Sequence, residues 1–585
     1  MSICHASGFG RTFAKASAPE SKSGRAAKPR LAIVLSGCYS LAVTLSLRSL
    51  RRSLVLLALG VSFVVQTGNF GSGDTARRFQ VTHWLWQNVP PVARHDSPDF
   101  GQIGRGGVRY AWYGIGQSLL MLPADMLVTA FSPSGLRRAT HFSQFRSLAV
   151  ALLTFPALDA LAVWLGFELL LELEFTPPVA ALGAMSLLFS TTFLHYMQVH
   201  QENNQILLCA LAGYWGVLRW RRTARMSALA IAAAALGFSI LIRIPDLAVA
   251  GSVLLFGVAV VVNSRDLSAA SRARALRLLV AMLSGGFLLG FAGDRFYQWR
   301  RFGSPFTFYT PMPMAYLRNV LHLHLPPGYP FSYPLFWGIY KPLFSANKSL
   351  FIYDPLLVIT LVLALGLWKR LDRKLRYGLL SLLLMLAGTI LGYAKYVDWS
   401  GNAAWGDRFT TVPVDLLAML AVPMLWRYRS LLPRRDFRLL AWSGIGGATL
   451  MQFLSLPLND NIERLQLAYS PTHSFFIPAR RVVNLVALAG HRFTAWGLAN
   501  NPYLQQHGVS VNLLPAYLNS LGEHRLAVFA WMLWLLILAF TLGFAMRLAF
   551  RAGKQAGRLE ENPAALTAAS DSRSDLSRFR ENCLK

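Results

Sequence analysis

The stretch GSGDTARR occupies residues 71–78, directly after the first apolar run that is long enough to cross a membrane, about 53–69. Basic residues mark the cytoplasmic end of such a run, and three stand before this one (Arg48, Arg51 and Arg52). The stretch therefore falls just outside the bilayer on the outer side, where its glycines lead into a helix start. An aspartate there caps backbone N–H groups, and one carboxylate oxygen stays free. Asp74 is thus both a capping residue and a candidate catalytic base.

Composition places the chain among multi-pass membrane proteins. Of its 585 residues, 54% are hydrophobic and only 14% are charged, whereas soluble domains carry about 25% charged residues. The net charge of +30 comes from cations clustered in short loops between apolar runs. This is the pattern of the positive-inside rule rather than of a nucleic-acid surface. The four cysteines are scattered, without metal-site spacing, and predict no disulfide framework.

Apolar runs recur along the whole chain at the length of a membrane-spanning helix. After 53–69 they lie near 111–131, 146–171, 177–195, 203–218, 227–243, 247–263, 277–294, 350–367, 375–393, 409–426, 438–456 and 526–546. The run 111–131 contains Gly114, Gly116, Pro123 and Asp125. We interpret it as a juxtamembrane or re-entrant helix, which keeps every basic loop on one side. The sequence therefore predicts an all-α bundle of about 12 transmembrane helices with both termini in the cytoplasm.

The predicted organisation has five parts. They are a disordered basic cytoplasmic N-terminus at 1–52 with an ambiguous apolar segment at 31–47, a transmembrane catalytic module at 53–456 whose first outer loop covers 70–145, an outer-face loop or cap at 457–525, a last transmembrane helix at 526–546, and a cytoplasmic tail at 547–585.

The unusual polar clusters all fall on the outer side of this topology, and ionisable groups at the ends of membrane helices usually line a site. The outer turn HYMQVHQENN at 195–204 is more polar than a turn requires. Its His200 and Glu202 are suitable partners for Asp74 around a divalent metal ion. Hydrogen-bonded turn residues are the alternative interpretation.

Three cations on the same side are candidate phosphate ligands. Arg243 begins the turn RIPD and pairs either with an anion or with Asp246. Lys348 belongs to an aromatic-rich loop that fits a lipid-phosphate site with sugar-stacking surfaces, or an interfacial aromatic belt. Arg408 closes the segment YVDWSGNAAWGDRF at 396–409, which also holds Trp399 and Trp405. Its guanidinium suits a phosphate, or a salt bridge to a nearby aspartate.

Four segments, taken in order, resemble the bacterial GT-C type of multi-pass glycosyltransferase, which includes protein O-mannosyltransferase relatives and aminoarabinose lipid A transferases. They are Gly73-Asp74 followed by Arg77, FGSP at 302–305, LFSANKSLFIYDP at 343–355, and WSG at 399–401 continuing to WGDRF at 405–409. The resemblance spans about 50–430. The chain departs from the family pattern at Thr75, where some members carry a second acid, at Ser349 in place of glycine and at Asp407 in place of proline.

The resemblance implies a GT-C bundle, a polyprenyl-phosphate sugar donor and an acceptor on the outer face. A lipid phosphate is a good leaving group, so one base suffices, unlike glycoside hydrolysis with its two carboxylates. Asp74 would be that base in an inverting displacement. The remaining roles would be donor phosphate binding by Arg243, Lys348 and Arg408, positioning of sugar or metal by His200, Glu202, Trp399 and Trp405, and metal ligation, if any, by Asp74, His200 and Glu202.

The predicted function is that of a hexosyl- or pentosyltransferase of the cell envelope, in the inner membrane, with its active site on the outer or periplasmic face. Its partners would be the lipid-linked sugar, membrane lipids and an acceptor that is a lipid, glycan or protein, but no nucleic acid. A flippase or transporter is one alternative, although its expected internal repeat is missing from the sequence. A lipid-linked-glycan ligase or polymerase, with a longer donor, is another.

Overall fold

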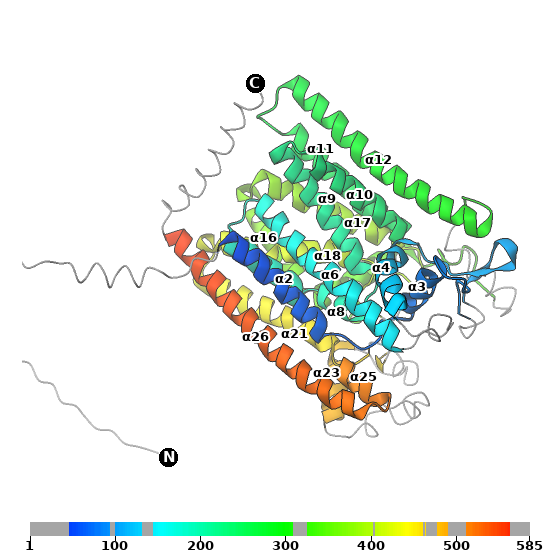
Figure 1. Cartoon of the computed structure of the whole chain (residues 1–585). Coiled ribbons are helices and arrows are strands. Elements are labelled where there is room, and N and C mark those ends of the chain that lie inside the picture. The colour runs from blue at the N-terminus through cyan, green and yellow to red at the C-terminus, as the bar shows by residue number, and fades with distance from the viewer. Residues whose placement is uncertain are drawn as a thin grey trace, which may run out of the picture. The chain divides into compact units, whose positions relative to one another are not determined.

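The apolar runs of the sequence fold into helices that pack side by side (Figure 1). The computed structural model describes residues 46–93, 100–131, 144–307, 324–401, 404–459, 462–463, 477–489 and 511–561. All of them belong to one unit that begins at Leu45. Within this described part, two short strands form an antiparallel pair and the other regular elements are helices.

The first half of the described chain contains the first outer loop and the helices around it. Its elements are α2 (Leu47–Val64), α3 (Gly73–Trp84), β1 (Gln102–Ile103), η1 (Arg105–Gly107), β2 (Arg109–Tyr110), α4 (Gly116–Phe131), α6 (Gln144–Glu172), α7 (Pro177–Ser190), α8 (Phe193–Val199), α9 (Asn203–Thr223), α10 (Met226–Ile242), η2 (Ile244–Asp246), α11 (Leu247–Val262) and α12 (Ala269–Phe302).

The second half adds shorter helices and one long C-terminal helix. Its elements are α14 (Leu335–Phe344), α15 (Leu350–Tyr353), α16 (Pro355–Leu367), η3 (Trp368–Arg370), α17 (Arg373–Tyr393), α18 (Thr411–Met419), α19 (Ala421–Arg427), η4 (Arg429–Leu431), α20 (Arg434–Leu439), η5 (Leu440–Ile445), α21 (Gly446–Ser455), α23 (Ile477–Ala489), α25 (Leu514–Ser520) and α26 (His524–Glu561).

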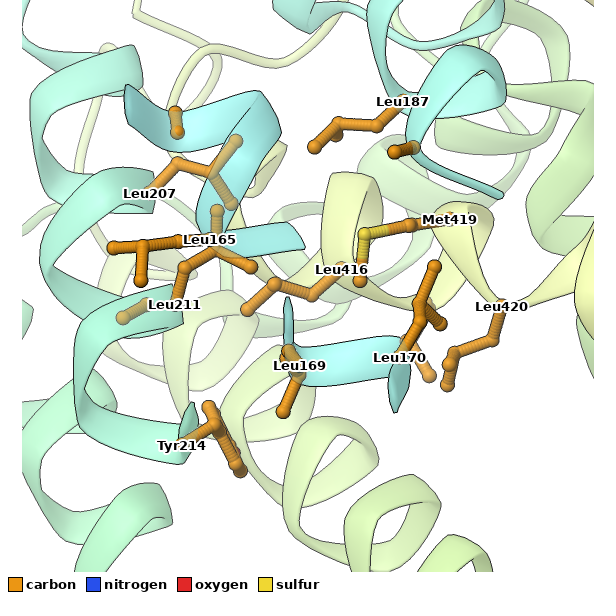
Figure 2. Close-up of a cluster of buried hydrophobic side chains, with 14 of the residues drawn as sticks. Leu165, Leu169, Leu170, Leu187, Leu207, Leu211, Tyr214, Leu416, Met419 and Leu420 are labelled. Carbon is orange, nitrogen blue, oxygen red and sulfur yellow. The ribbon is translucent and has the colours of Figure 1, made fainter. Parts of the chain in front are cut away.

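The core lies where α6, α7, α9 and α18 meet. Interdigitated leucines dominate it (Figure 2), and close packing of this kind is what holds helices together in a lipid environment. The labelled side chains are Leu165, Leu169 and Leu170 of α6, Leu187 of α7, Leu207, Leu211 and Tyr214 of α9, and Leu416 and Met419 of α18 with Leu420 just after it.

Five helices of the described chain are long and apolar enough to cross a membrane, which identifies a helical integral membrane protein. They lie in the segments Phe145–Glu172, Ile244–Val262, Ala269–Phe302, Arg373–Tyr393 and His524–Gly557. The helices α7 and α8 make a sixth crossing if they count as one span, although they bend by 52° at their junction. Each predicted apolar run corresponds to one helix or to a broken pair, except 438–456, which covers the end of α20, η5 and α21. The total of about 12 spans is not confirmed and stays a prediction.

The first outer loop packs against the bundle through α3 and α4. Residues 111–131 give a helix only from Gly116 to Phe131, which is 16 residues long and contains Pro123. A buried network fixes this helix: the Asp125 carboxylate lies 2.8 Å from Nη2 of Arg146 on α6 and 2.9 Å from Nδ1 of His83 on α3. Since an unpaired buried charge is costly, these contacts hold α3 in one position against α4 and α6.

The long helix α12 contacts α10 through glycines. A Cβ atom on Gly290 would collide with the backbone carbonyl of Gly237, and one on Gly286 would collide with that of Ala233. Small residues of this kind let two membrane helices approach closely. The glycine of the FGSP motif has a different role: Gly303 follows the end of α12 with φ +82°, a left-handed conformation that glycine adopts without strain.

We predict that Gly290→Leu lowers the free energy of unfolding by about 1–3 kcal/mol, because the new side chain meets backbone that cannot yield. Gly285→Leu, in the same helix, is the matched control, since a Cβ there meets nothing within 4 Å. Thermal unfolding of the two purified variants measures the difference. Equal unfolding temperatures would contradict the close approach of α10 and α12.

Candidate active site

Asp74 stands in the first turn of α3, where the sequence predicts a helix start. Ser72, in an extended conformation, takes the capping position, so Asp74 itself is not the cap. Gly71 has φ +65°, and a Cβ on it would lie 2.7 Å from the carbonyl oxygen of Gln198. Only glycine therefore allows the chain to pass this close to the end of α8. A carboxylate in the first turn of a helix also interacts favourably with the helix dipole.

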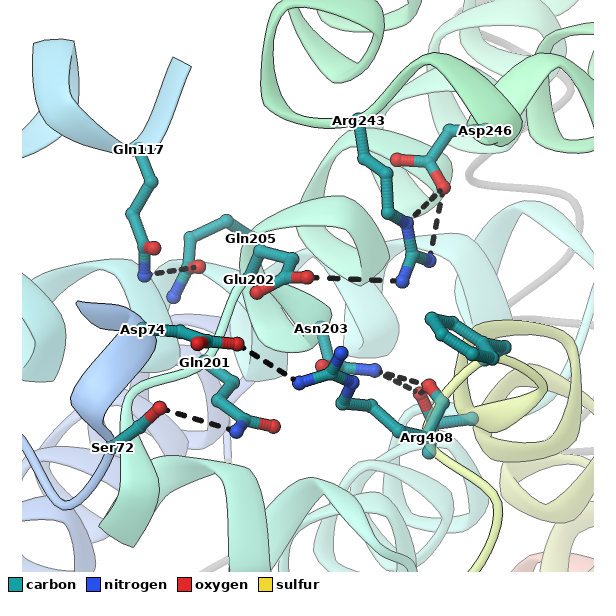
Figure 3. Close-up of polar contacts among 12 residues, drawn as sticks. Ser72, Asp74, Gln117, Gln201, Glu202, Asn203, Gln205, Arg243, Asp246 and Arg408 are labelled. Carbon is teal, nitrogen blue, oxygen red and sulfur yellow. Dashed lines mark hydrogen bonds and ion pairs between the residues drawn. The ribbon is translucent and has the colours of Figure 1, made fainter. Parts of the chain in front are cut away.

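Two side chains, Tyr113 and Arg408, hold the Asp74 carboxylate, and Figure 3 shows the contact with Arg408. The Tyr113 hydroxyl donates to Oδ1 at 2.6 Å, and Arg408 Nη1 donates to Oδ2 at 3.2 Å across 334 positions of sequence. Burial, followed by the Asp74 charge, raises the pKa of Tyr113, so its hydroxyl keeps its proton. The Asp74 side chain stays 28% exposed. The carboxylate is therefore oriented by the protein and still accessible.

Glu202 lies behind Asp74, buried between two arginines. Its Oε2 is 2.9 Å from Arg78 Nη1 and its Oε1 is 3.8 Å from Arg243 Nη1. Burial raises the pKa of this carboxyl, but the charges of Arg78, Arg408 and Arg243 outweigh it and hold the pKa at about 2. Glu202 is thus a permanent anion at neutral pH, and it ties α3 to the start of α9 and to the turn after α10.

A hydrogen bond holds the backbone of Arg408, and one donor of its side chain has no protein partner in the described structure. Asn203 Nδ2 donates to the Arg408 carbonyl at 2.6 Å, and Gly401 leaves space for the guanidinium, because a Cβ there would lie 2.8 Å from Arg408 Nε. Burial lowers the pKa of Arg408, but nearby Glu202 and Asp74 raise it overall. The buried Nε has no hydrogen-bond partner among the described residues, and the side chain as a whole is 18% exposed, so a ligand can reach the guanidinium.

The other two predicted phosphate ligands have protein partners. Arg243 pairs with Asp246 at 3.1 Å as well as with Glu202, so the salt-bridge interpretation of this turn holds. Lys348 Nζ donates to the carbonyl oxygens of Ala404 at 2.6 Å and Gly406 at 2.9 Å. It therefore stabilises the WGDRF turn from which Arg408 projects.

Both predicted tryptophans are buried. Trp399 is 9% exposed and Trp405 only 1%. The Trp405 ring is covered by Tyr353 at 5.1 Å and His195 at 6.3 Å between ring centroids, and by the Arg481 guanidinium at 5.2 Å. Arg481 belongs to α23, in the predicted cap region. Trp405 thus joins that region to the turn carrying Arg408.

His200 faces away from the Asp74 carboxylate. Its ring stacks on Phe155 with centroids 4.4 Å apart, and its Nε2 lies 2.9 Å from Gln66 Oε1. Burial lowers the pKa of this imidazole to about 3, so the ring is neutral. Its carbonyl oxygen, by contrast, accepts from the Thr75 hydroxyl at 2.9 Å and from Gln117 at 2.7 Å, which anchors the first outer loop.

The three predicted metal ligands are not arranged around a common point in the described structure. Asp74, His200 and Glu202 each contact other groups, and both carboxylates are already paired with arginines. Across the ranges that the structure describes, no group of three or more His, Cys, Asp or Glu side chains is arranged to hold one.

Two residues of the site were missed by the sequence analysis. Arg78 ends the stretch 71–78. It lies four residues after Asp74 on a helix, and this spacing could have predicted that both side chains lie on one face. Tyr113 lies at the start of the run 111–131, and nothing in the local pattern distinguishes it from an aromatic residue of the membrane interface.

No protein-family model matches the chain, and no curated protein matches its sequence. Among solved structures, it is similar to the Archaeoglobus fulgidus oligosaccharyltransferase AglB, solved in complex with an inhibitory peptide and a dolichol-phosphate. The sequence identity is 15% and the TM-score 0.41, and the match covers 72% of this chain and 58% of that one. It is also similar to ArnT from Cupriavidus metallidurans bound to undecaprenyl phosphate, with 15% identity and a TM-score of 0.40 over 86% of this chain and 77% of that one.

Both proteins are glycosyltransferases of the GT-C type, the class that the four motifs resemble. The chain spans little more than half the length of the oligosaccharyltransferase.

We predict that Glu202→Gln destabilises the protein by about 3–5 kcal/mol, because it leaves the buried Arg78 without its anion, whereas Arg243 keeps Asp246. The pKa of Glu202 is lower in the folded state, so its stabilisation is present above about pH 4.5 and disappears as the pH falls toward 2. The gap in unfolding temperature between wild type and variant should shrink over that range. Glu174→Gln, whose side chain is 56% exposed, is the control with little effect; a gap independent of pH would argue against the ion pairs.

Proposed function

We propose that the chain is an integral membrane glycosyltransferase that moves a sugar from a polyprenyl-phosphate donor to an acceptor hydroxyl, with Asp74 as the base. The observation that carries this proposal is the contact of a partly exposed carboxylate, Asp74, with an arginine that has an unused donor, Arg408. A base and a phosphate-binding cation in direct contact are the two groups that this reaction needs.

The proposed reaction is a single inverting displacement. The acceptor oxygen attacks the anomeric carbon of the sugar while Asp74 takes the hydroxyl proton. The bond between that carbon and the phosphate oxygen breaks, and the polyprenyl phosphate leaves as an anion beside Arg408. No general acid is required, because the departing phosphate is stable without protonation. No step passes through a metal ion.

The charge balance of the site suggests an order of events. Three arginines (Arg78, Arg243 and Arg408) face three carboxylates (Asp74, Glu202 and Asp246), so these arginines are matched in charge without the donor. An arriving phosphate must therefore compete with Asp74 for Arg408. When it succeeds, it releases the carboxylate that acts as the base. Donor binding and activation of the base are then one event.

The remaining predicted residues keep supporting roles in this proposal. Lys348 would hold the turn of Arg408 in place and add positive charge near the phosphate. Glu202, with His200 and the two tryptophans Trp399 and Trp405, would fix the walls that position the sugar. The basic loops support an inner-membrane location with the site on the outer face and cytoplasmic termini.

We predict that Asp74→Asn lowers the transfer rate at least 100-fold, since removal of a general base typically costs 10²–10⁴-fold. The unfolding temperature should change little, because the side chain is partly exposed. The assay is transfer from membrane-extracted polyprenyl-phosphate sugars by the purified full chain in proteoliposomes, with Glu523→Gln, an exposed acid, as the control. Full activity of the Asp74 variant would end the proposal.

The mass of the transferred group identifies the donor in the same assay. One sugar unit supports the monosaccharide transferase, whereas a longer glycan would assign the site to a ligase or polymerase. Profiling of glycolipids and glycoproteins in a deletion strain identifies the acceptor.

We predict that Tyr113→Phe lowers kcat about 10- to 100-fold and leaves the KM for the donor nearly unchanged. The substitution removes the hydrogen bond to Asp74 Oδ1, a bond to a charged group, but keeps the ring that packs 4.3 Å from the Arg78 guanidinium. Steady-state kinetics separate the two constants. A rise in KM with unchanged kcat would show that Tyr113 acts in donor binding rather than in positioning the base.

A further inference from the structure

A basic pocket lies far from the candidate active site, between the end of α11 and the starts of α12 and α17. Its volume is about 380 Å³. Three arginines line it, Arg265, Arg272 and Arg373, together with Tyr377 and the edge residue Val262. None of these residues takes part in the proposed reaction, so the pocket requires its own explanation.

The two helices that connect the pocket to the active site place it at the other membrane surface. Helix α11 begins beside the Arg243–Asp246 pair and ends at Val262, and α17 runs from Arg373 to Tyr393, whose ring stacks on Phe409 with centroids 3.9 Å apart. At 1.5 Å per residue, α11 is about 24 Å long and α17 about 31 Å. These lengths are close to the thickness of the hydrocarbon layer, about 30 Å.

The positive charge of the pocket is not neutralised by the protein. Arg265 and Arg373 are exposed and form no ion pair or side-chain hydrogen bond with any residue in the described ranges. The adjacent acids are occupied elsewhere: Asp266 pairs with Arg221 and Asp372 pairs with Arg427. The pocket therefore presents two guanidinium groups that are available to an external anion.

Arg272 supplies a third donor from the pocket wall. Its Nη2 donates to the carbonyl oxygens of Ser264 at 2.9 Å and Leu267 at 3.2 Å, which fixes the guanidinium. Its Nε is buried and has no hydrogen-bond partner among the described residues.

One wall of the pocket continues into the lipid-facing surface. Leu255 and Val262 lie seven residues apart on α11, hence on one helix face, and both are exposed, 53% and 42%. An anion with an attached hydrocarbon chain fits this arrangement, because its chain would follow that apolar stripe while its charged group entered the pocket.

We propose that this pocket binds the phosphate headgroup of an anionic phospholipid in the leaflet opposite the active site. Guanidinium forks match phosphate oxygens in geometry and charge. Basic pockets between transmembrane helices at the membrane surface are suited to such headgroups. The inference does not depend on the proposed transferase activity.

The test is lipid binding by the purified, delipidated full chain, measured by native mass spectrometry with added phosphatidylglycerol or phosphatidylcholine. Arg265→Gln/Arg373→Gln should fold normally, since neither side chain has a protein partner in the described structure. It should weaken phosphatidylglycerol binding about thirtyfold, the loss expected from two arginines at a membrane surface. Arg434→Gln/Arg435→Gln removes the same charge from exposed positions on α20 outside the pocket and should have little effect.

Three results would overturn the proposal. The first is equal binding of phosphatidylglycerol and phosphatidylcholine by the wild type. The second is an equal loss of binding in the pocket variant and the α20 control, which would indicate general surface charge. The third is binding of inorganic phosphate through Arg265 and Arg373 without binding of phosphatidylglycerol, which would make the pocket a site for a free anion.

Discussion

The buried charge of Glu202 is the constraint on which the candidate site depends. A carboxylate in this environment is tolerable only with cations against it, and they come from Arg78 on α3 and Arg243 after α10. Three segments that are distant in sequence are thereby held together. Because Asp74 lies one helical turn before Arg78, fixing Arg78 also fixes the direction in which Asp74 points, and that direction is toward Arg408.

Neutral polar side chains extend this frame without adding charge. Gln117 of α4 donates to Gln205 of α9 at 3.2 Å, and Gln201 donates to Ser72 at the start of α3 at 3.2 Å (Figure 3). These contacts fasten the first outer loop to the ends of the bundle helices. Amides suit this task, because each donates and accepts and none competes with the carboxylates for the arginines.

The sequence predicted the helices well because membrane insertion depends on local composition. The runs 146–171 and 247–263 match α6 and α11 within two residues. The meeting of Asp74, Glu202, Arg243 and Arg408 agrees with the predicted topology, in which all four lie on one side. The orientation of His200 was not predicted, since stacking on Phe155 is a tertiary contact. The position of Trp405 beneath Arg481 also depends on a tertiary contact. So does that of Lys348, which donates hydrogen bonds to carbonyl oxygens 56 and 58 positions further along the chain.

The two ends of α11 and α17 show how surroundings decide what an arginine does. At the end near the candidate site, Arg243 and Arg408 each face a carboxylate, as expected because an unmatched charge in a buried setting would be costly. In the proposed reaction, a donor phosphate would have to displace Asp74 from Arg408. At the far end, Arg265 and Arg373 face no acid in the described structure. A phosphate would displace no carboxylate there, so the only cost of binding would be its desolvation. Under the two proposals, the first arrangement would make anion binding conditional on the right substrate, whereas the second would favour a resident ligand.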